Sequence, residues 1–114
     1  MNTLYSIIGL FALGAILGMY LLTFVMRNKE TPKAVALIHG LFVAIALIML
    51  INYSVKNGPG LTESIVLFVI AALGGFYLFY RDINAKPIPK WLAIVHGLAA
   101  VAGFGFLLVF AFVK

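Results

Sequence analysis

The chain has no cysteine and few charged residues. Only 10% of its 114 residues are charged, whereas about a quarter are charged in an average soluble protein. The absence of cysteine excludes disulfides, thiolate ligands, iron–sulfur clusters and cysteine nucleophiles. The three acidic residues, Glu30, Glu63 and Asp82, all fall in or beside predicted loops. Because proton-coupled antiporters generally need a carboxylate within the membrane, this distribution argues against that class.

Other catalytic and binding signals are also missing. The sequence shows no Ser-His-acid set, no paired carboxylates and no glycine-rich phosphate loop after a strand, so hydrolytic chemistry has no support. The net charge is +5, but the basic residues gather mainly in two short loops. This placement indicates membrane topology rather than a nucleic-acid surface.

Hydrophobic residues make up 65% of the chain, and most of them fall in four long runs. The runs cover residues 4–26, 34–53, 64–80 and 91–113, and each can cross a bilayer as a helix of about 20 residues. The first run is too long for a signal-peptide core, so we expect it to be retained. Short connections make neighbouring helices antiparallel. The sequence predicts an all-α polytopic membrane protein, an up-down-up-down bundle of four transmembrane helices forming one domain over residues 1–114.

The loops predict the orientation of this bundle in the membrane. Loops 27–33 and 81–90 each hold three basic residues, whereas the loop between them holds only Lys56. Since cytoplasmic loops carry the excess of lysine and arginine, these two loops are expected in the cytoplasm and both termini outside. The expected location is a bacterial inner (plasma) membrane, with the lipid bilayer as the main surrounding.

One stretch of the sequence occurs twice. Residues 32–41 read PKAVALIHGL, and residues 89–98, 57 positions later, read PKWLAIVHGL. At the same offset, and without a gap, further residues match: Leu10-Phe11 with Leu67-Phe68, Ala15 with Ala72, Gly18 with Gly75, Tyr20-Leu21 with Tyr77-Leu78, and Lys29 with Lys86. We therefore expect a tandem duplication of a two-helix hairpin, residues 1–57 and 58–114. The two copies would be related by a pseudo-two-fold axis along the membrane normal.

The two histidines of the chain, His39 and His96, lie one in each copy of the repeat. They fall in the second and fourth predicted helices, which are diagonally opposite in a four-helix ring. Each lies six residues after the lysine of its copy, or about 9 Å along a helix at 1.5 Å per residue. The two imidazoles are therefore predicted at one depth, facing each other if both helices turn them inward.

Mostly small side chains surround the histidines in the predicted bundle. They lie on the histidine faces and on the neighbouring helices: Ala36, Val43, Ala46, Ala93, Ala100, Gly103, Gly14, Gly18, Gly74 and Gly75. Such a lining favours a gap between the imidazoles rather than a filled core. Two diagonal histidines beside a gap are typical of haem b with both axial positions ligated. His39 and His96 are thus predicted metal ligands, and Gly18 and Gly75 part of the haem-binding surface.

Two further matched pairs fit this interpretation. Lys33 and Lys90 lie near the cytoplasmic edge, where they could meet the propionates of a haem. Tyr20 and Tyr77 lie close to the depth of the histidines, where a hydroxyl could accept the proton of the non-ligating ring nitrogen. All four are therefore predicted cofactor-binding residues.

Each of these features also has a simpler explanation. The histidines could bond Tyr20 and Tyr77 and tie each hairpin together without a cofactor, as in a structural or assembly subunit of a membrane complex. Small residues in membrane helices are commonly packing surfaces. Two histidines are too few for a closed zinc site, although a homodimer could bring four together. Met19, Met26 and Met49 do not form the clustered motif expected of copper handling.

The leading hypothesis from the sequence is a small b-type cytochrome that holds one haem between His39 and His96. A bis-histidine iron has no open position, which favours electron transfer over oxygen chemistry. The protein would pass single electrons from a quinol to a partner protein or serve as a haem-binding subunit, with no role for nucleic acid. The arrangement is similar, in architecture only, to four-helix membrane cytochromes that hold haem between two histidines.

Overall fold

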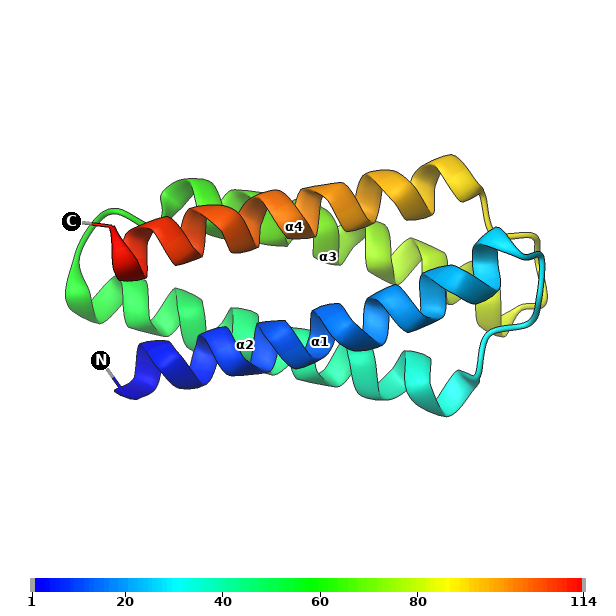
Figure 1. Ribbon diagram of the computed structural model, residues 1–114, viewed down its shortest axis with the longest axis horizontal. Helices are drawn as coiled ribbons and strands as arrows, with labels where there is room; N and C mark the ends of the chain where they lie inside the picture. The colour runs from blue at the N-terminus through cyan, green and yellow to red at the C-terminus, as the bar shows by residue number, and fades with distance from the viewer. Residues whose placement is uncertain (1, 114) are drawn as a thin grey trace.

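The computed structural model describes residues 2–113 and consists of four long helices (Figure 1). They are α1 (Asn2–Met26), α2 (Lys33–Asn57), α3 (Thr62–Ile83) and α4 (Lys90–Phe112). Each helix runs antiparallel to the next, so the predicted all-α up-down-up-down bundle is confirmed. Both termini lie at one end of the bundle, which we call the terminal end. The α1–α2 and α3–α4 connections lie at the other, which we call the basic end.

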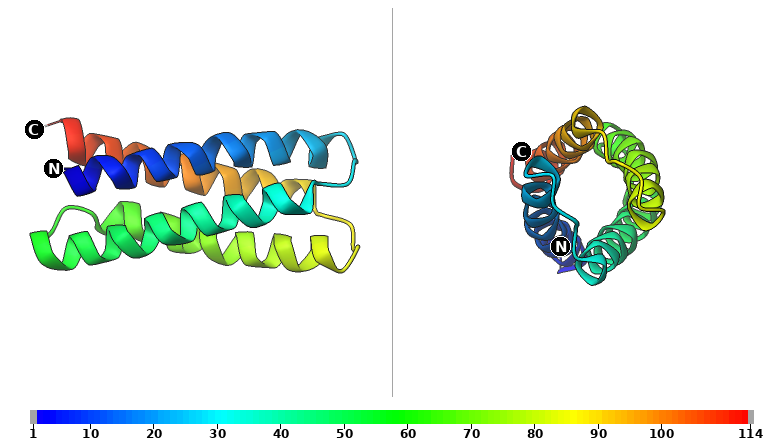
Figure 2. Two further views of the ribbon diagram at one scale, coloured as in Figure 1. Left: turned by 90° about the horizontal axis from the view of Figure 1, so that it is seen from below. Right: turned by 90° about the vertical axis from the view of Figure 1, so that its right-hand side faces the viewer.

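The four helices form a ring in chain order (Figure 2). Each packs against its neighbours in that ring, and α1 and α3, like α2 and α4, lie diagonally opposite without backbone contact in the described part of the chain. At 22 to 25 residues, the helices are about 33 to 38 Å long at 1.5 Å per residue. A bilayer core is about 30 Å thick, so all four helices are long and apolar enough to cross it.

The outer surface of the bundle is apolar. Large side chains such as Ile16, Ile48 and Phe76 are about two-thirds exposed, at 66%, 68% and 70%. A soluble protein rarely exposes an apolar surface that surrounds the whole molecule. Lipid tails are as apolar as these side chains, so the surface suits contact with a bilayer. The pattern agrees with the predicted integral membrane protein.

The helices begin and end in the same way at positions 57 residues apart. Pro32 and Pro89 precede α2 and α4, and their carbonyls accept the amides of Ala36 and Ala93 at 3.0 and 3.1 Å. Proline suits this position because the first helical amides have no partner within the helix.

The C-terminal ends of α1 and α3 are also alike. Asn28 and Ala85 both have a left-handed backbone, with φ of 56° and 55°. The next amide, of Lys29 or Lys86, donates to a carbonyl five residues back at 2.9 Å, in Phe24 or Arg81. This is a Schellman cap, which usually places glycine at the left-handed position. The two ends thus share a turn whose residue types do not match.

The hydrophobic core is confined to the terminal half of the bundle. Its buried members come from all four helices: Leu4, Ile7, Phe11, Ala46, Leu50, Leu61, Phe68, Leu107 and Ala111. At its inner edge the rings of Phe11 and Phe68, from the diagonal helices α1 and α3, stack with centroids 3.9 Å apart and planes at 3°. Beyond this pair, towards the basic end, the buried hydrophobic residues of the described helices are the alanines Ala71 and Ala93.

Candidate functional site

The two histidines meet across the axis of the bundle, just beyond the phenylalanine pair. His39 comes from α2 and His96 from α4, and both side chains are partly buried. Their ring centroids lie 6.4 Å apart, and the ring planes are nearly perpendicular at 84°. Because α2 and α4 are diagonal in the ring of helices, this pair joins the two hairpins at their centre.

A backbone carbonyl of the same hairpin holds each imidazole. Nδ1 of His39 lies 2.7 Å from the carbonyl oxygen of Gly14, and Nδ1 of His96 lies 2.7 Å from that of Ala71. A carbonyl can only accept, so Nδ1–H is the donor in both bonds. In the neutral ring, Nε2 then keeps its lone pair. Both histidines are thus held in the tautomer that a metal ligand needs.

Glycines make room for the two rings. A Cβ atom built on Gly18 would lie 2.9 Å from Cε1 of His39, and one on Gly75 would lie 3.0 Å from Cε1 of His96. The first distance is shorter than real side-chain contacts show, and the second is tighter than nine in ten of them. Gly18 and Gly75 therefore lie directly against the two rings, and the imidazoles themselves occupy the space that these glycines leave.

The glycine contacts predict a difference between two pairs of substitutions. Gly18→Ala and Gly75→Ala force the rings to move and are expected to destabilise the bundle by about 1–3 kcal/mol. Gly40→Ala and Gly97→Ala are matched controls beside the histidines, because a Cβ there meets nothing within 4 Å. The controls should be neutral or stabilising, by up to about 1 kcal/mol from helix propensity. Denaturant unfolding in detergent measures all four, and equal effects in both pairs would contradict the packing described.

The tyrosines do not make the contacts predicted for them. Tyr20 is 49% exposed and packs edge-on against Phe24, with centroids 5.1 Å apart. The Tyr77 hydroxyl accepts a bond from Nη1 of Arg81 at 3.4 Å. The expected tyrosine–histidine bond is therefore wrong, since carbonyls take its place. The reason is helical geometry: Tyr20 is two residues past the inward-facing Gly18, about 200° around the helix.

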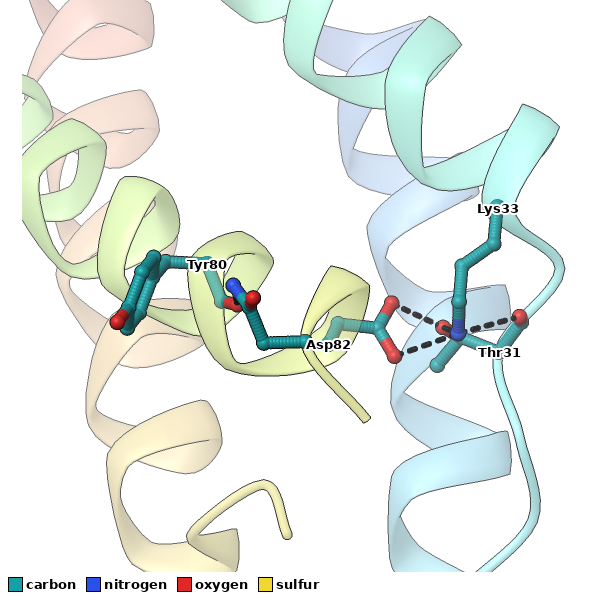
Figure 3. Close-up of polar contacts among 5 residues, drawn as sticks. Thr31, Lys33, Tyr80 and Asp82 are labelled. Carbon is teal, nitrogen blue, oxygen red and sulfur yellow. Dashed lines mark hydrogen bonds and ion pairs between the residues drawn. The ribbon is translucent and has the colours of Figure 1, made fainter. Parts of the chain in front are cut away.

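The two lysines have different surroundings, of which Figure 3 shows those of Lys33. Nζ of Lys33 lies 2.7 Å from Oδ1 of Asp82 and 3.2 Å from both oxygens of Thr31. The Thr31 hydroxyl donates to the other carboxylate oxygen of Asp82. This Thr31–Lys33–Asp82 cluster links the start of α2 to the end of α3. Lys90 is exposed at the start of α4.

Sequence reasoning missed Thr31 and Asp82 as partners of Lys33. Thr31 and Asp82 are 51 residues apart. Neither belongs to the repeated motif, so no spacing or pattern in the sequence connected them. The cluster means that the predicted role of Lys33 at a haem propionate competes with an ion pair inside the protein.

Comparison with known protein families, curated proteins and solved structures found no match. The chemistry of the site is therefore argued from its own geometry. No group of three or more histidine, cysteine, aspartate or glutamate residues comes together among residues 2–113, so a metal site would have to be built on two imidazoles.

The separation of the histidine pair matches that of two imidazoles bound to one metal ion. Imidazole nitrogens bind first-row metals at about 2 Å, so two rings on opposite sides of one metal have centres about 6 Å apart. The observed separation of 6.4 Å between the centroids of His39 and His96 agrees with this requirement. The donor atoms agree as well, because both Nδ1 atoms are committed to carbonyls and both Nε2 atoms keep a lone pair.

Proposed function

We propose that this protein is a small membrane b-type cytochrome that holds one haem between His39 and His96. The observation that carries the proposal is the histidine pair itself, two imidazoles 6.4 Å apart with both Nδ1 atoms bonded to carbonyls. Such bonds to the outer ring nitrogen fix the orientation of a ligand and raise its basicity.

The distribution of the core supports a cofactor between the two hairpins. Large buried side chains fill the terminal half up to Phe11 and Phe68, whereas the buried hydrophobic positions beyond them are alanines. Within each hairpin the helices pack closely, and the contact across the two hairpins is less extensive. A flat group ligated from α2 and α4 would lie at the centre of the bundle with its edges towards α1 and α3, the helices whose Gly18 and Gly75 approach the two imidazoles.

We also propose that the chain arose by tandem duplication of one hairpin, residues 1–57 and 58–114. The buried pairs Phe11 with Phe68 and Leu50 with Leu107 lie at the repeat offset, as do the carbonyls of Gly14 and Ala71 that hold the histidines. The left-handed turns at the ends of α1 and α3 obey the same offset although their residue types differ. A two-fold site explains why both proposed ligands are histidines and why a backbone carbonyl holds Nδ1 of each.

A haem, when bound, supplies one-electron oxidation and reduction. The chain's own residues position the two imidazoles and surround them with apolar helices that exclude water. A haem held by both His39 and His96 would have no open position for oxygen, which favours electron transfer over oxygen chemistry. We propose a quinol or a redox protein as the partner, in a bacterial inner membrane with the basic end in the cytoplasm.

The spectrum of the purified protein tests the proposal. Protein produced with an ample supply of haem is expected to contain about one haem per chain and to show the reduced-minus-oxidised bands of a six-coordinate low-spin iron. Protein from cells unable to make haem is the control and should be colourless until haem is added. Colourless protein under both conditions would overturn the proposal.

One observation favours a second candidate, a structural or assembly subunit. Each imidazole already has a hydrogen bond and a glycine contact within its own hairpin, which is what a packing role requires. In that case the histidines tie α1 to α2 and α3 to α4 without a cofactor. The same spectra distinguish the two, because a structural subunit takes up no haem.

A further inference from the structure

The two-fold correspondence between the hairpins breaks down at the basic end. Lys33 and Lys90 occupy equivalent positions, 57 residues apart. Lys33 has Asp82 and Thr31 as partners, but the positions equivalent to these are Val25 and Ile88. Neither valine nor isoleucine can accept a hydrogen bond from a side chain or carry a charge. The α1–α4 side therefore has no counterpart of the Thr31–Lys33–Asp82 cluster.

The Asp82 carboxylate is well held in this cluster. Its side chain is 11% exposed, and both of its oxygens are occupied, Oδ1 by the Lys33 ammonium and Oδ2 by the Thr31 hydroxyl. Charge-assisted bonds of this kind are stronger than neutral ones. The ion pair leaves the α2–α3 side of the basic end with no net charge from these residues. The α1–α4 side keeps the positive charge of Lys90.

We propose that Lys90 binds the carboxylates of the cofactor and that Asp82 determines this choice by occupying Lys33. The inference rests on the proposed haem function and names which of two equivalent lysines serves it. A carboxylate approaching Lys33 meets an ammonium already neutralised and the negative charge of Asp82 beside it. Lys33 and Lys90 are both exposed, Lys33 at 48%, so the two lysines differ in their partners and not in their exposure. A carboxylate approaching Lys90 meets an ammonium whose position equivalent to Asp82 is the uncharged Val25. The charge asymmetry thus gives a nearly two-fold site one preferred side for an anionic group.

The rate at which haem leaves the protein tests this assignment. Haem b is loaded into each variant, and its transfer to an excess of a haem-scavenging apoprotein is followed by absorbance. Lys90→Gln is expected to lose haem about fivefold faster, since a partly exposed ion pair contributes up to about a factor of five. Adding Asp82→Asn to Lys90→Gln frees Lys33 and should restore retention to within about twofold of the wild type.

Two controls separate this role from a general loss of folding. Lys33→Gln combined with Asp82→Asn removes the ion pair as a neutral unit and should leave haem loss unchanged within about twofold. Haem dimethyl ester, which lacks the carboxylate charges, should leave the wild type and Lys90→Gln at the same rate.

The outcomes distinguish this inference from the proposed function. Equal haem loss from Lys90→Gln and the wild type overturns the role of Lys90 while the proposed function stands. If haem dimethyl ester leaves Lys90→Gln faster than it leaves the wild type, the role of Lys90 is also overturned, because the ester has no carboxylate charge for Lys90 to bind. Failure of Asp82→Asn to restore retention overturns the role of Asp82. A wild type that takes up no haem overturns both the inference and the proposed function.

Discussion

Replacing His96 by alanine is expected to weaken haem binding by more than about 100-fold and to convert any remaining bound iron to a five-coordinate, high-spin state. The substitution removes one of two axial ligands. Loss of groups that merely orient a metal ligand already costs about 10- to 100-fold, so loss of the ligand itself should cost more. The bundle should stay folded, because the core residues lie in the terminal half, away from His96. Haem titration and the reduced-minus-oxidised spectrum measure both effects.

Added imidazole provides a readout that a structural role would not give. Alanine at position 96 leaves a space the size of the lost ring beside Gly75, and free imidazole can enter it and ligate the iron. The low-spin spectrum should return at millimolar concentrations of imidazole. His39→Ala should behave in the same way, since Gly18 and Gly14 surround His39 as Gly75 and Ala71 surround His96. A spectrum identical to that of the wild type in either variant would exclude that histidine as a ligand.

Tyrosine variants are the matched control for this experiment. Tyr20→Phe and Tyr77→Phe remove the hydroxyls once expected to bond the histidines. Both tyrosines are about half exposed, and the Nδ1 atoms donate to carbonyls instead. The spectra of these variants should therefore be those of the wild type.

Much of the fold could be predicted from the sequence because a bilayer restricts a chain of long apolar segments to membrane-spanning helices. Four apolar runs and three short connections leave few arrangements open, and the up-down bundle follows from them. The diagonal placement of the second and fourth helices followed from the same connections. The repeat offset of 57 residues also predicts that His39 and His96 lie at one depth.

The details of the site could not be predicted in the same way. The acceptors of the histidine hydrogen bonds are backbone carbonyls. Every residue has a backbone carbonyl, so the residue types in the sequence do not reveal which one accepts. Gly14 gave only an indirect signal, as a small residue one helical turn before Gly18 on the same face. The pairing of Lys33 with Asp82 depends on how two loops fold over the end of the bundle. Sequence periodicity says nothing about such contacts.

The side-chain packing differs between the two halves of the bundle. The terminal half is packed through large buried residues that hold the hairpins together, and the basic half holds the histidine pair among small residues. The stacked rings of Phe11 and Phe68 mark the boundary. Substitution at the phenylalanine pair is therefore expected to change stability without altering the contacts of the two histidines.

Phe68→Ala is expected to destabilise the bundle by about 2–3 kcal/mol. In soluble proteins the same change costs about 3–5 kcal/mol, the sum of a transfer term and a cavity term. In a bilayer the transfer term is small because lipid is as apolar as the core, but the lost contacts of the cavity remain. Phe68 stacks on Phe11 at 3.9 Å on the bundle axis, where no lipid can fill the space. Reversible unfolding in mixed micelles measures the change.

Phe76→Ala on the same helix is the matched control, because Phe76 is 70% exposed on the outer surface. It loses contacts mainly with lipid and should change the unfolding free energy by less than about 0.5 kcal/mol. In the Phe11→Ala and Phe68→Ala double variant, the two losses should not add, since each single change already breaks the stacked pair. If Phe68→Ala and Phe76→Ala change the unfolding free energy equally, the Phe11–Phe68 pair is not tightly packed inside the bundle. The boundary would then lie elsewhere along the bundle, because a tightly packed aromatic pair is what separates the large buried residues from the histidines.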